Sequence, residues 1–155
     1  MTLPAPTRIA TPITEPARRR RLTAARAEAL VRRWHRALTD RRPLGELTEH
    51  LANGLRLDLP SGVFRGVEGF RRWYEAGDLL PLAGRAVALT GVDVRLLSPL
   101  HAEVTATTIT GPGAVPTRHE WWVVRQPEGP RIRTISVRQP AAAPATAART
   151  ALLSA

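Results

Sequence analysis

Three stretches of the chain space their hydrophobic residues at i, i+3, i+4 and i+7, as one face of an α-helix does. In the first stretch, Trp34 belongs to an apolar stripe that begins just after Thr23, a residue suited to cap a helix N-terminus. Proline opens the second stretch, and glycine closes the second and third. We therefore predict helices from Thr23 to about Asp40, from Pro43 to Asn53-Gly54, and from about Val67 to Ala76.

Most of the remaining sequence between these helices and residue 139 alternates hydrophobic and polar residues, which is typical of half-buried β-strands. The predicted strands are residues 55–59, 63–65, 86–97, 100–110, 118–125 and 131–138. Short turns such as Ser98-Pro99 and Gly111-Pro112-Gly113 join the last four strands, so these neighbours should pair antiparallel. Helices followed by a strand meander predict an α+β fold class.

The two ends of the chain differ from the part between them. Residues 1–22 are rich in arginine and proline and predict a disordered leader, whose removal should hardly change thermal stability. Residues 140–155 are of low complexity and rich in alanine, and they predict a loose tail. One folded domain is therefore expected over residues 23–139, a common size for a single hydrophobic core.

The chain has 155 residues and a formal net charge of +10, and all of its basic residues are arginine. Half of the excess positive charge lies in residues 1–22 and 140–155, outside the predicted domain. Arginine without lysine, beside abundant alanine, proline and glycine, indicates a GC-rich genome. Charge alone supports only salt-dependent attraction to nucleic acid, and the strands lack interleaved aromatics for stacking bases. We therefore expect no specific nucleic-acid binding.

Composition also excludes several kinds of site. The chain has no cysteine, so it has no disulfide and no thiolate metal site. Its four histidines, His35, His50, His101 and His119, lack metal-ligand spacing, and no acid cluster accompanies them, so we expect no metal and no cofactor. No run approaches the roughly 18 apolar residues of a membrane span, and no secretory signal is seen. We expect a cytoplasmic protein without a membrane partner.

Four local sequences are the most specific features of the chain. At residues 30–38, 53–60, 64–74 and 121–125 they read LVRRWHRAL, NGLRLDLP, FRGVEGFRRWY and WWVVR. These sequences resemble the opening helix, first strand, hairpin-to-helix junction and a late strand of the SnoaL-like branch of the nuclear transport factor 2-like superfamily. The likeness covers about residues 24–139. It implies a curved, mostly antiparallel sheet wrapped over three helices, with a conical pocket for a small hydrophobic or polycyclic substrate.

The resemblance also bears on the chemistry. Ketosteroid isomerases on this fold use a first-helix tyrosine as an oxyanion donor, and Trp34 occupies the matching position here. Their general-base aspartate precedes the proline that ends the first strand. Leu59 stands at that position, and strand alternation aims Asp58 to the opposite side. This difference weighs against steroid-isomerase chemistry. Tyr74 matches a pocket tyrosine of the third helix.

Alternation within residues 118–125 divides their side chains between two faces. We favour His119, Trp121 and Val123 inside the domain, and Trp122 on the outer face with Val124. His119 is then the best acid–base candidate, since an unperturbed histidine titrates near pH ~6.5. The structural alternative is a histidine that faces solvent or only forms a hydrogen bond. The other histidines are weaker candidates, because His35 lies off the apolar stripe of its helix and His101 lies beside a turn.

The candidate site residues fall into two groups. The catalytic candidates are His119, Tyr74 and Trp34, and the substrate-binding candidates are Leu59, Trp73, Trp121 and Arg133. By alternation, Arg133 shares a face with Ile135 and Val137 and could hold a carboxylate or an enolate. Each group has a structural alternative, because aromatic residues at helical spacing often only pack the core and a strand-end arginine often faces solvent.

These observations predict a small-molecule biosynthetic enzyme, such as a cyclase, isomerase or dehydratase, that uses metal-free acid–base chemistry in an aromatic pocket. A non-catalytic ligand-binding or dimeric interaction module is the alternative, because one fold hosts many functions. The outer face that carries Trp122 predicts a homodimer, since an exposed apolar patch usually marks an interface.

Overall fold

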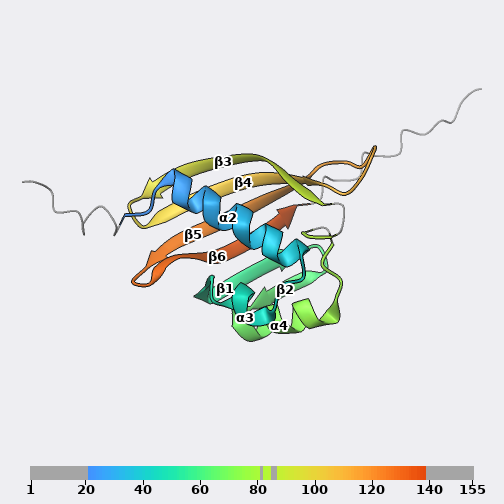
Figure 1. The fold of residues 1–155 in the computed structure, drawn as a ribbon, viewed down its shortest axis with the longest axis horizontal. Helices are drawn as coiled ribbons and strands as arrows, with labels where there is room; N and C mark the ends of the chain where they lie inside the picture. The colour runs from blue at the N-terminus through green and yellow to red at the C-terminus, as the bar shows by residue number, and fades with distance from the viewer. Residues whose placement is uncertain (1–20, 81, 85–86, 139–155) are drawn as a thin grey trace, which may run out of the picture.

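The computed structural model describes residues 21–80, 82–84 and 87–138 (Figure 1). Its helices are α2 (Ala24–Thr39), α3 (Leu44–Thr48) and α4 (Gly66–Ala76). Its strands are β1 (Leu51–Leu59), β2 (Gly62–Arg65), β3 (Ala88–Ser98), β4 (His101–Ile109), β5 (Thr117–Gln126) and β6 (Gly129–Arg138). The predicted tail, and the predicted leader up to residue 20, lie outside the described residues.

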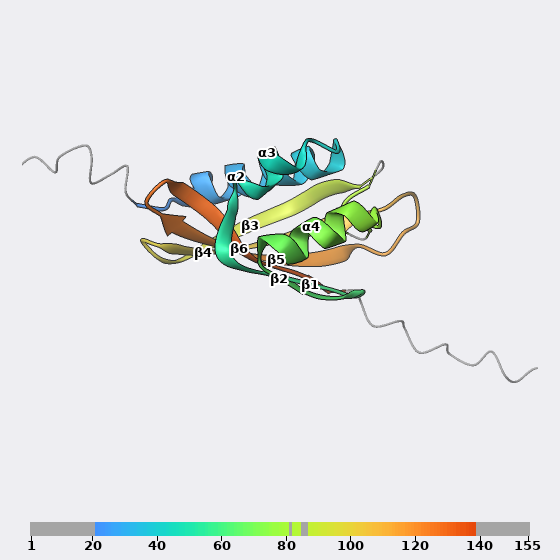
Figure 2. The same cartoon turned by 90° about the horizontal axis from the view of Figure 1, so that it is seen from below.

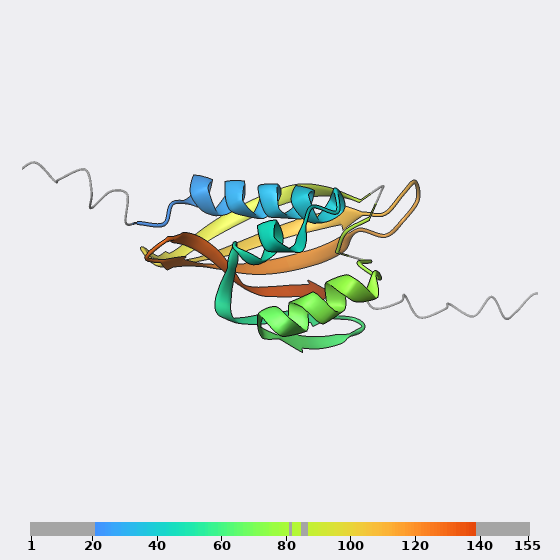
Figure 3. The same cartoon turned by 60° about the horizontal axis from the view of Figure 1, so that its bottom comes forward.

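The strands form one sheet in the order β2-β1-β6-β5-β4-β3. From β3 to β6, each strand pairs antiparallel with its neighbour in sequence, as the short turns predicted. β1 pairs antiparallel with β2 but parallel with β6, so the sheet is mixed. The helices lie on one side of the sheet, with α2 against β3, β4 and β6 and α4 against β1 and β2 (Figures 2 and 3). The predicted fold class, a curved and mostly antiparallel sheet over three helices, is confirmed.

The core between helices and sheet centres on aromatic side chains. Trp34 of α2 is fully buried, and its ring centroid lies 5.7 Å from that of Phe70 on α4 and 5.6 Å from that of Trp121 on β5. The apolar stripe predicted for α2 is buried around it. Aromatic pairs at these separations add to the stability that area burial provides. This cluster therefore joins α2 and α4 to β5 in the middle of the sheet.

Helix α2 begins where the sequence predicted, and it buries His35, which the predicted stripe did not include. The Thr23 hydroxyl accepts a hydrogen bond from the backbone N–H of Arg26 at 3.2 Å, the geometry of an N-cap. His35 was predicted to lie off the apolar stripe, yet it is buried. Its ring Nε2 lies 2.8 Å from the carbonyl oxygen of Leu82. Leu82 belongs to a segment that follows α4, so the pattern of α2 alone could not reveal this contact.

The prediction that Asn53-Gly54 ends the second helix is wrong. Helix α3 already ends at Thr48, and β1 begins at Leu51, so the Asn-Gly pair lies inside the strand. The pairing of β1 with β6 shifts register between Leu51 and Arg56, and Gly54 has a φ of +75°. A β-bulge needs such a left-handed residue as much as a helix end does. The glycine signal was therefore real, but it marks a bulge.

Leu22, the last residue of the predicted leader, packs with the domain. Leu22 is only 3% exposed and belongs to the hydrophobic core. Its backbone N–H donates to the carbonyl of Pro99 at 2.8 Å, which ties the residue before α2 to the turn between β3 and β4. Removing residues 1–22 would therefore remove a core residue, so we now expect this deletion to lower stability.

Leu22→Ala should lower the free energy of unfolding by about 2 kcal/mol, because it deletes buried methyl groups at a site that can collapse only partly. Chemical denaturation of the full-length chain measures the change. Leu100→Ala is the matched control, because Leu100 is 50% exposed on the β3–β4 turn and should cost about 0.5 kcal/mol or less. Equal effects of the two variants would contradict the core role of Leu22.

Candidate active site

The inner face of the sheet is apolar except at one end. Along β4 and β5, the buried side chains are mostly alanine, valine and tryptophan, but Thr108, Thr117 and His119 are buried and polar. We call these three residues the polar patch. His119, Trp121 and Val123 point inside as the alternation predicted, and Trp122 is 44% exposed on the other face.

His119 is fully buried and has one polar partner. Its Nε2 lies 2.6 Å from the Thr108 hydroxyl oxygen, and its ring stacks on Trp121 with a centroid distance of 6.3 Å and an interplanar angle of 12°. Among the residues that the structure describes, its Nδ1 has no hydrogen-bond partner. Burial, together with the nearby His35, lowers the pKa of His119 to about 4. The ring is therefore neutral at pH 7, with one N–H and one nitrogen whose lone pair can accept a proton.

Two indole N–H groups in the same interior are also unpaired. The Nε1 atoms of Trp73 and Trp121 are buried and have no hydrogen-bond partner in the described part of the chain. Trp121 stacks on His119, and Trp73 joins the same cluster through Phe70, whose ring centroid lies 5.7 Å away. An unsatisfied buried polar group costs about 1–3 kcal/mol, so three of them in one cluster need an explanation. A ligand oxygen beside Trp121 would accept from its indole N–H and lie next to the His119 ring.

Two adjoining hollows open toward this interior. One, of about 660 Å³, is lined by Thr117 of the polar patch, and the other, of about 450 Å³, by Trp73. Both hollows share Ser61 and Asp78, so we treat them together as the mouth. Figure 3 shows the elements around it, the β1–β2 turn, the end of α4 and the β4–β5 loop, at one end of the molecule.

Thr117 of the polar patch lines the mouth, and His119 lies beyond it on β5. Thr117 lies two residues before His119 on the same strand face, which places it about 7 Å nearer the mouth. Exposed apolar side chains stand at the entrance, namely Val63, Leu80 and Val115. A molecule that enters here would pass an apolar rim before it reaches the polar patch.

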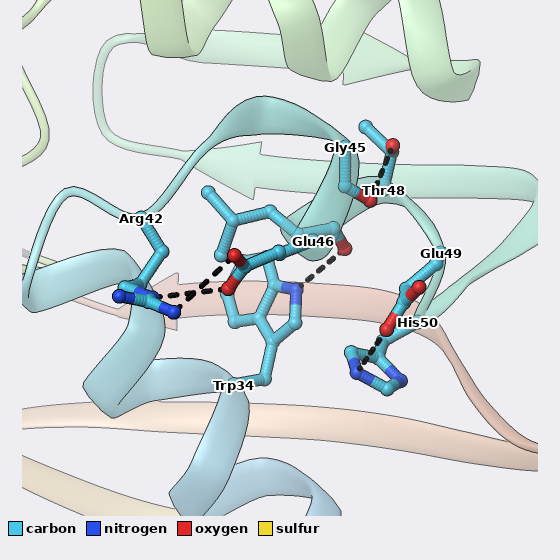
Figure 4. Close-up of polar contacts among 8 residues, drawn as sticks. Trp34, Arg42, Gly45, Glu46, Thr48, Glu49 and His50 are labelled. Carbon is cyan, nitrogen blue, oxygen red and sulfur yellow. Dashed lines mark hydrogen bonds and ion pairs between the residues drawn. The ribbon is translucent and has the colours of Figure 1, made fainter.

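Two predicted catalytic residues have their donors occupied by the protein itself. The indole N–H of Trp34 donates to the carbonyl of Leu47 at 3.0 Å (Figure 4). The hydroxyl of Tyr74 donates to the carbonyl of Arg42 at 3.0 Å. An indole has a single N–H, so Trp34 cannot also polarise a substrate in this arrangement. The predicted donor roles of Trp34 and Tyr74 therefore do not fit the structure, which uses both groups to hold α3 and the loop before it.

The predicted substrate-binding set divides in a similar way. Leu59, Trp73 and Trp121 are buried on the inner side, whereas Arg133 is exposed. The reason is a bulge in β6, where Trp122 pairs with Thr134 but Val123 pairs with Ile132. Arg133 has no residue opposite it and does not share the inward face of Ile135 and Val137, contrary to the prediction.

Asp58 points away from the interior, as predicted. It lies between buried Leu57 and Leu59 on β1, and its carboxylate pairs with the guanidinium of Arg56 at 3.3 Å. No described inward-facing position of β1 therefore carries a carboxylate. Within the described ranges, no group of three or more potential ligand side chains could hold a metal ion.

Sequence reasoning missed Thr108, Thr117 and His35. A signal existed for Thr117, because it has the same strand parity as His119. Thr108 could be found only from the strand pairing, which sets Thr108 opposite Thr117 and diagonal to His119. No local signal pointed to His35.

Trp34→Phe should lower the free energy of unfolding by about 2 kcal/mol, because it leaves the buried Leu47 carbonyl without its donor and replaces indole by a smaller ring. Thermal or chemical unfolding measures this loss. Turnover of a folded sample should change little. Reduced turnover at unchanged stability would instead mean that the indole N–H contacts the reacting group.

Comparisons with known proteins address the fold. No protein-family model matches the chain, and no curated protein matches it in sequence. Solved structures do match. A nuclear transport factor 2-like protein of unknown function from Pseudomonas putida KT2440 aligns with a TM-score of 0.63 and 19% identity, over 77% of this chain and 89% of that one.

Two further matches have activities in their names. A proposed ketosteroid isomerase from Shewanella frigidimarina aligns with a TM-score of 0.59 and 14% identity, over 72% of this chain and 94% of its own. A hexachlorocyclohexane dehydrochlorinase from Novosphingobium barchaimii aligns with a TM-score of 0.59 and 12% identity, over 74% of this chain and 84% of its own.

In the part of the chain that the structure describes, no helix is long and apolar enough to span a membrane.

At these levels of identity, the structural matches establish architecture and leave the reaction open. Together with the strand order and the helices on one face of the sheet, they show that this chain has the nuclear transport factor 2-like fold, as its local sequences predicted.

Proposed function

We propose that the protein is a SnoaL-like acid–base enzyme that isomerises, cyclises or dehydrates a hydrophobic small molecule, with His119 as the proton-transfer group. The observation that carries the proposal is the buried, neutral imidazole stacked on Trp121, whose indole N–H is unpaired among the described residues. Buried titratable groups with shifted pKa values mark candidate active sites. The apolar rim at the mouth supports a hydrophobic substrate with an oxygen at one end.

In this proposal each residue has one task. Trp121, whose ring stacks on that of His119, donates its N–H to a substrate carbonyl and stabilises the charge that develops on its oxygen, and Trp73 lines the mouth. His119 removes a proton from the neighbouring carbon. It then returns that proton to another carbon in an isomerisation or to a departing hydroxyl, released as water, in a dehydration. Thr108 holds the imidazole ring in place, and Leu59 contributes apolar wall.

A non-catalytic ligand-binding module is the second candidate. One observation favours it: the buried polar side chains of the described residues are His35, Thr108, Thr117 and His119, with no carboxylate among them. A histidine with a pKa of about 4 is also a weak base. A ligand-binding site needs only the unpaired donors and the apolar walls.

A panel of hydrophobic compounds tests the proposal. Each ketone in the panel is matched with a hydrocarbon and an amine of similar shape. Tryptophan fluorescence reports binding, because three of the four tryptophans are in the interior. The proposal predicts saturable binding of ketones, and slow conversion of at least one of them. Binding without conversion across enolisable ketones would favour the ligand-binding module, and preferential binding of amines would contradict both candidates.

We also propose that the chain forms a homodimer through the face of the sheet that the helices leave uncovered. Trp122 of β5 is 44% exposed on this face. It pairs with Glu103 of β4 on one side and with Thr134 of β6 on the other. The apolar area is smaller than the sequence predicted, because Val124 is buried. Charged neighbours such as Arg95, paired with Glu103 at 2.6 Å, would form a polar rim around a central tryptophan.

The proposed homodimer predicts the molecular mass of the protein in solution. Sedimentation of the full-length chain at micromolar concentration should give a dimer, and Trp122→Glu should give a folded monomer, because it places a charge at the centre of the contact. Leu80→Ser is the matched control, since Leu80 is 55% exposed at the mouth, away from this face. A wild-type monomer would refute the proposal.

A further inference from the structure

A separate cavity lies between α2 and the start of β3. It measures about 200 Å³ and is lined by Arg32, His35, Arg36 and Thr39 of α2 and by residues 87–89. The residues that line it differ entirely from those of the mouth. Its polar lining is therefore independent of the site proposed above.

The hydrogen bond of His35 fixes which ring nitrogen carries the proton. Its Nε2 lies 2.8 Å from the backbone carbonyl of Leu82, and a carbonyl can only accept, so Nε2 must donate. Burial lowers the pKa of His35 despite this bond, which keeps the ring neutral at pH 7. A neutral imidazole has one N–H, so Nδ1 carries a lone pair. No hydrogen bond to Nδ1 occurs among the described residues.

Two guanidinium groups accompany this lone pair. Arg32 uses its Nε on Glu28 at 2.8 Å, one helical turn away. In the described part of the chain, Arg36 takes part in no ion pair. None of the described residues that line the cavity is acidic. The lining thus includes two positively charged donor groups and the imidazole that carries this lone pair.

We propose that this cavity binds a small oxyanion that keeps one hydroxyl group, such as hydrogen phosphate or a 2-hydroxycarboxylate. The anionic oxygens accept from Arg36 and Arg32, because guanidinium groups match oxyanions in charge and geometry. The hydroxyl of the ligand donates to Nδ1 of His35. An oxyanion without a hydroxyl group has only acceptor oxygens. It cannot donate to Nδ1, so the lone pair of that nitrogen stays without a hydrogen bond.

Hydrogen phosphate and sulfate separate these contributions, because they have similar size and shape but sulfate carries no proton at pH 7. Calorimetric titration of the full-length chain should show saturable phosphate binding, and sulfate should bind about tenfold or more weakly. Lactate should likewise bind more tightly than propionate if the natural ligand is a hydroxycarboxylate. Lactate binding more tightly than phosphate would identify the hydroxycarboxylate as the better ligand, and the reverse would identify phosphate.

Substitutions on α2 distinguish a site from general charge attraction. Arg36→Gln should weaken phosphate binding about tenfold, whereas Arg33→Gln, an exposed arginine that does not line the cavity, should change it by about twofold or less. The ¹⁵N resonances of the His35 ring should shift on phosphate addition, a readout that requires no variant. Equal binding of phosphate and sulfate, equal losses in both variants, or no saturation by about 50 mM would each overturn the proposal.

Discussion

Lowering the pH from 7 to 4 should destabilise the protein by about 3 kcal/mol through His119 alone. An unfolded histidine binds a proton near pH ~6.5, whereas burial lowers the pKa of His119 in the folded protein to about 4. Between these values the unfolded state holds more protons than the folded state, so stability falls as the pH falls. Above pH ~6.5 the full stability is present, and below about 4 this contribution stops changing.

Urea unfolding at a series of pH values measures this dependence. His119→Gln is the matched variant, because an amide does not titrate and can still bond to the Thr108 hydroxyl. The variant should be less stable at pH 7 but should lose about 3 kcal/mol less on acidification. His35 is also buried with a lowered pKa, so part of the slope should remain in the variant. Identical pH slopes for both proteins would show that His119 is not held neutral by burial.

The second large effect concerns turnover. With any ketone that the panel shows to be converted, His119→Gln should lower turnover about a hundredfold or more, in line with the loss of a general acid–base group. Glutamine cannot move the proton, although it keeps much of the shape and the bond to Thr108. Initial rates and the Michaelis constant separate this chemical role from a loss of binding.

Two variants serve as controls for that loss. His101→Gln removes an exposed histidine of the neighbouring strand β4, and Asp58→Asn removes the outward carboxylate of β1. Both should retain turnover within about twofold. If Asp58→Asn abolished turnover while His119→Gln did not, the base would lie on β1, as in the isomerase arrangement that Leu59 argues against.

The sequence was informative wherever one pattern repeated over many residues. The helical stripe through Trp34 and the alternation through His119 and Trp121 predicted both the elements and the faces that are buried. Such patterns record which side of an element avoids water, and burial decides that side in the folded protein. The fold class followed from the order of these elements.

The errors come from features that a repeating pattern does not contain. A bulge in β6 reverses the parity at Arg133, and a bulge in β1 uses the Asn53-Gly54 pair that was expected to end a helix. Similarly, the partners of Trp34 and Tyr74 are backbone carbonyls, of Leu47 and Arg42, that sequence spacing cannot place. The chemistry of a site depends on these contacts, which is why the fold was more predictable than the donors.

The central claim is that His119 is a buried, neutral imidazole that contacts the ligand. Long-range ¹⁵N NMR of the histidine rings tests it most directly, because the two ring nitrogens report protonation and hydrogen bonding separately. The account predicts that the His119 resonances stay those of a neutral ring down to about pH 5 and shift when a ketone from the panel is added at pH 7. Titration near pH ~6.5, with no response of the His119 ring to a ligand that binds, would contradict it.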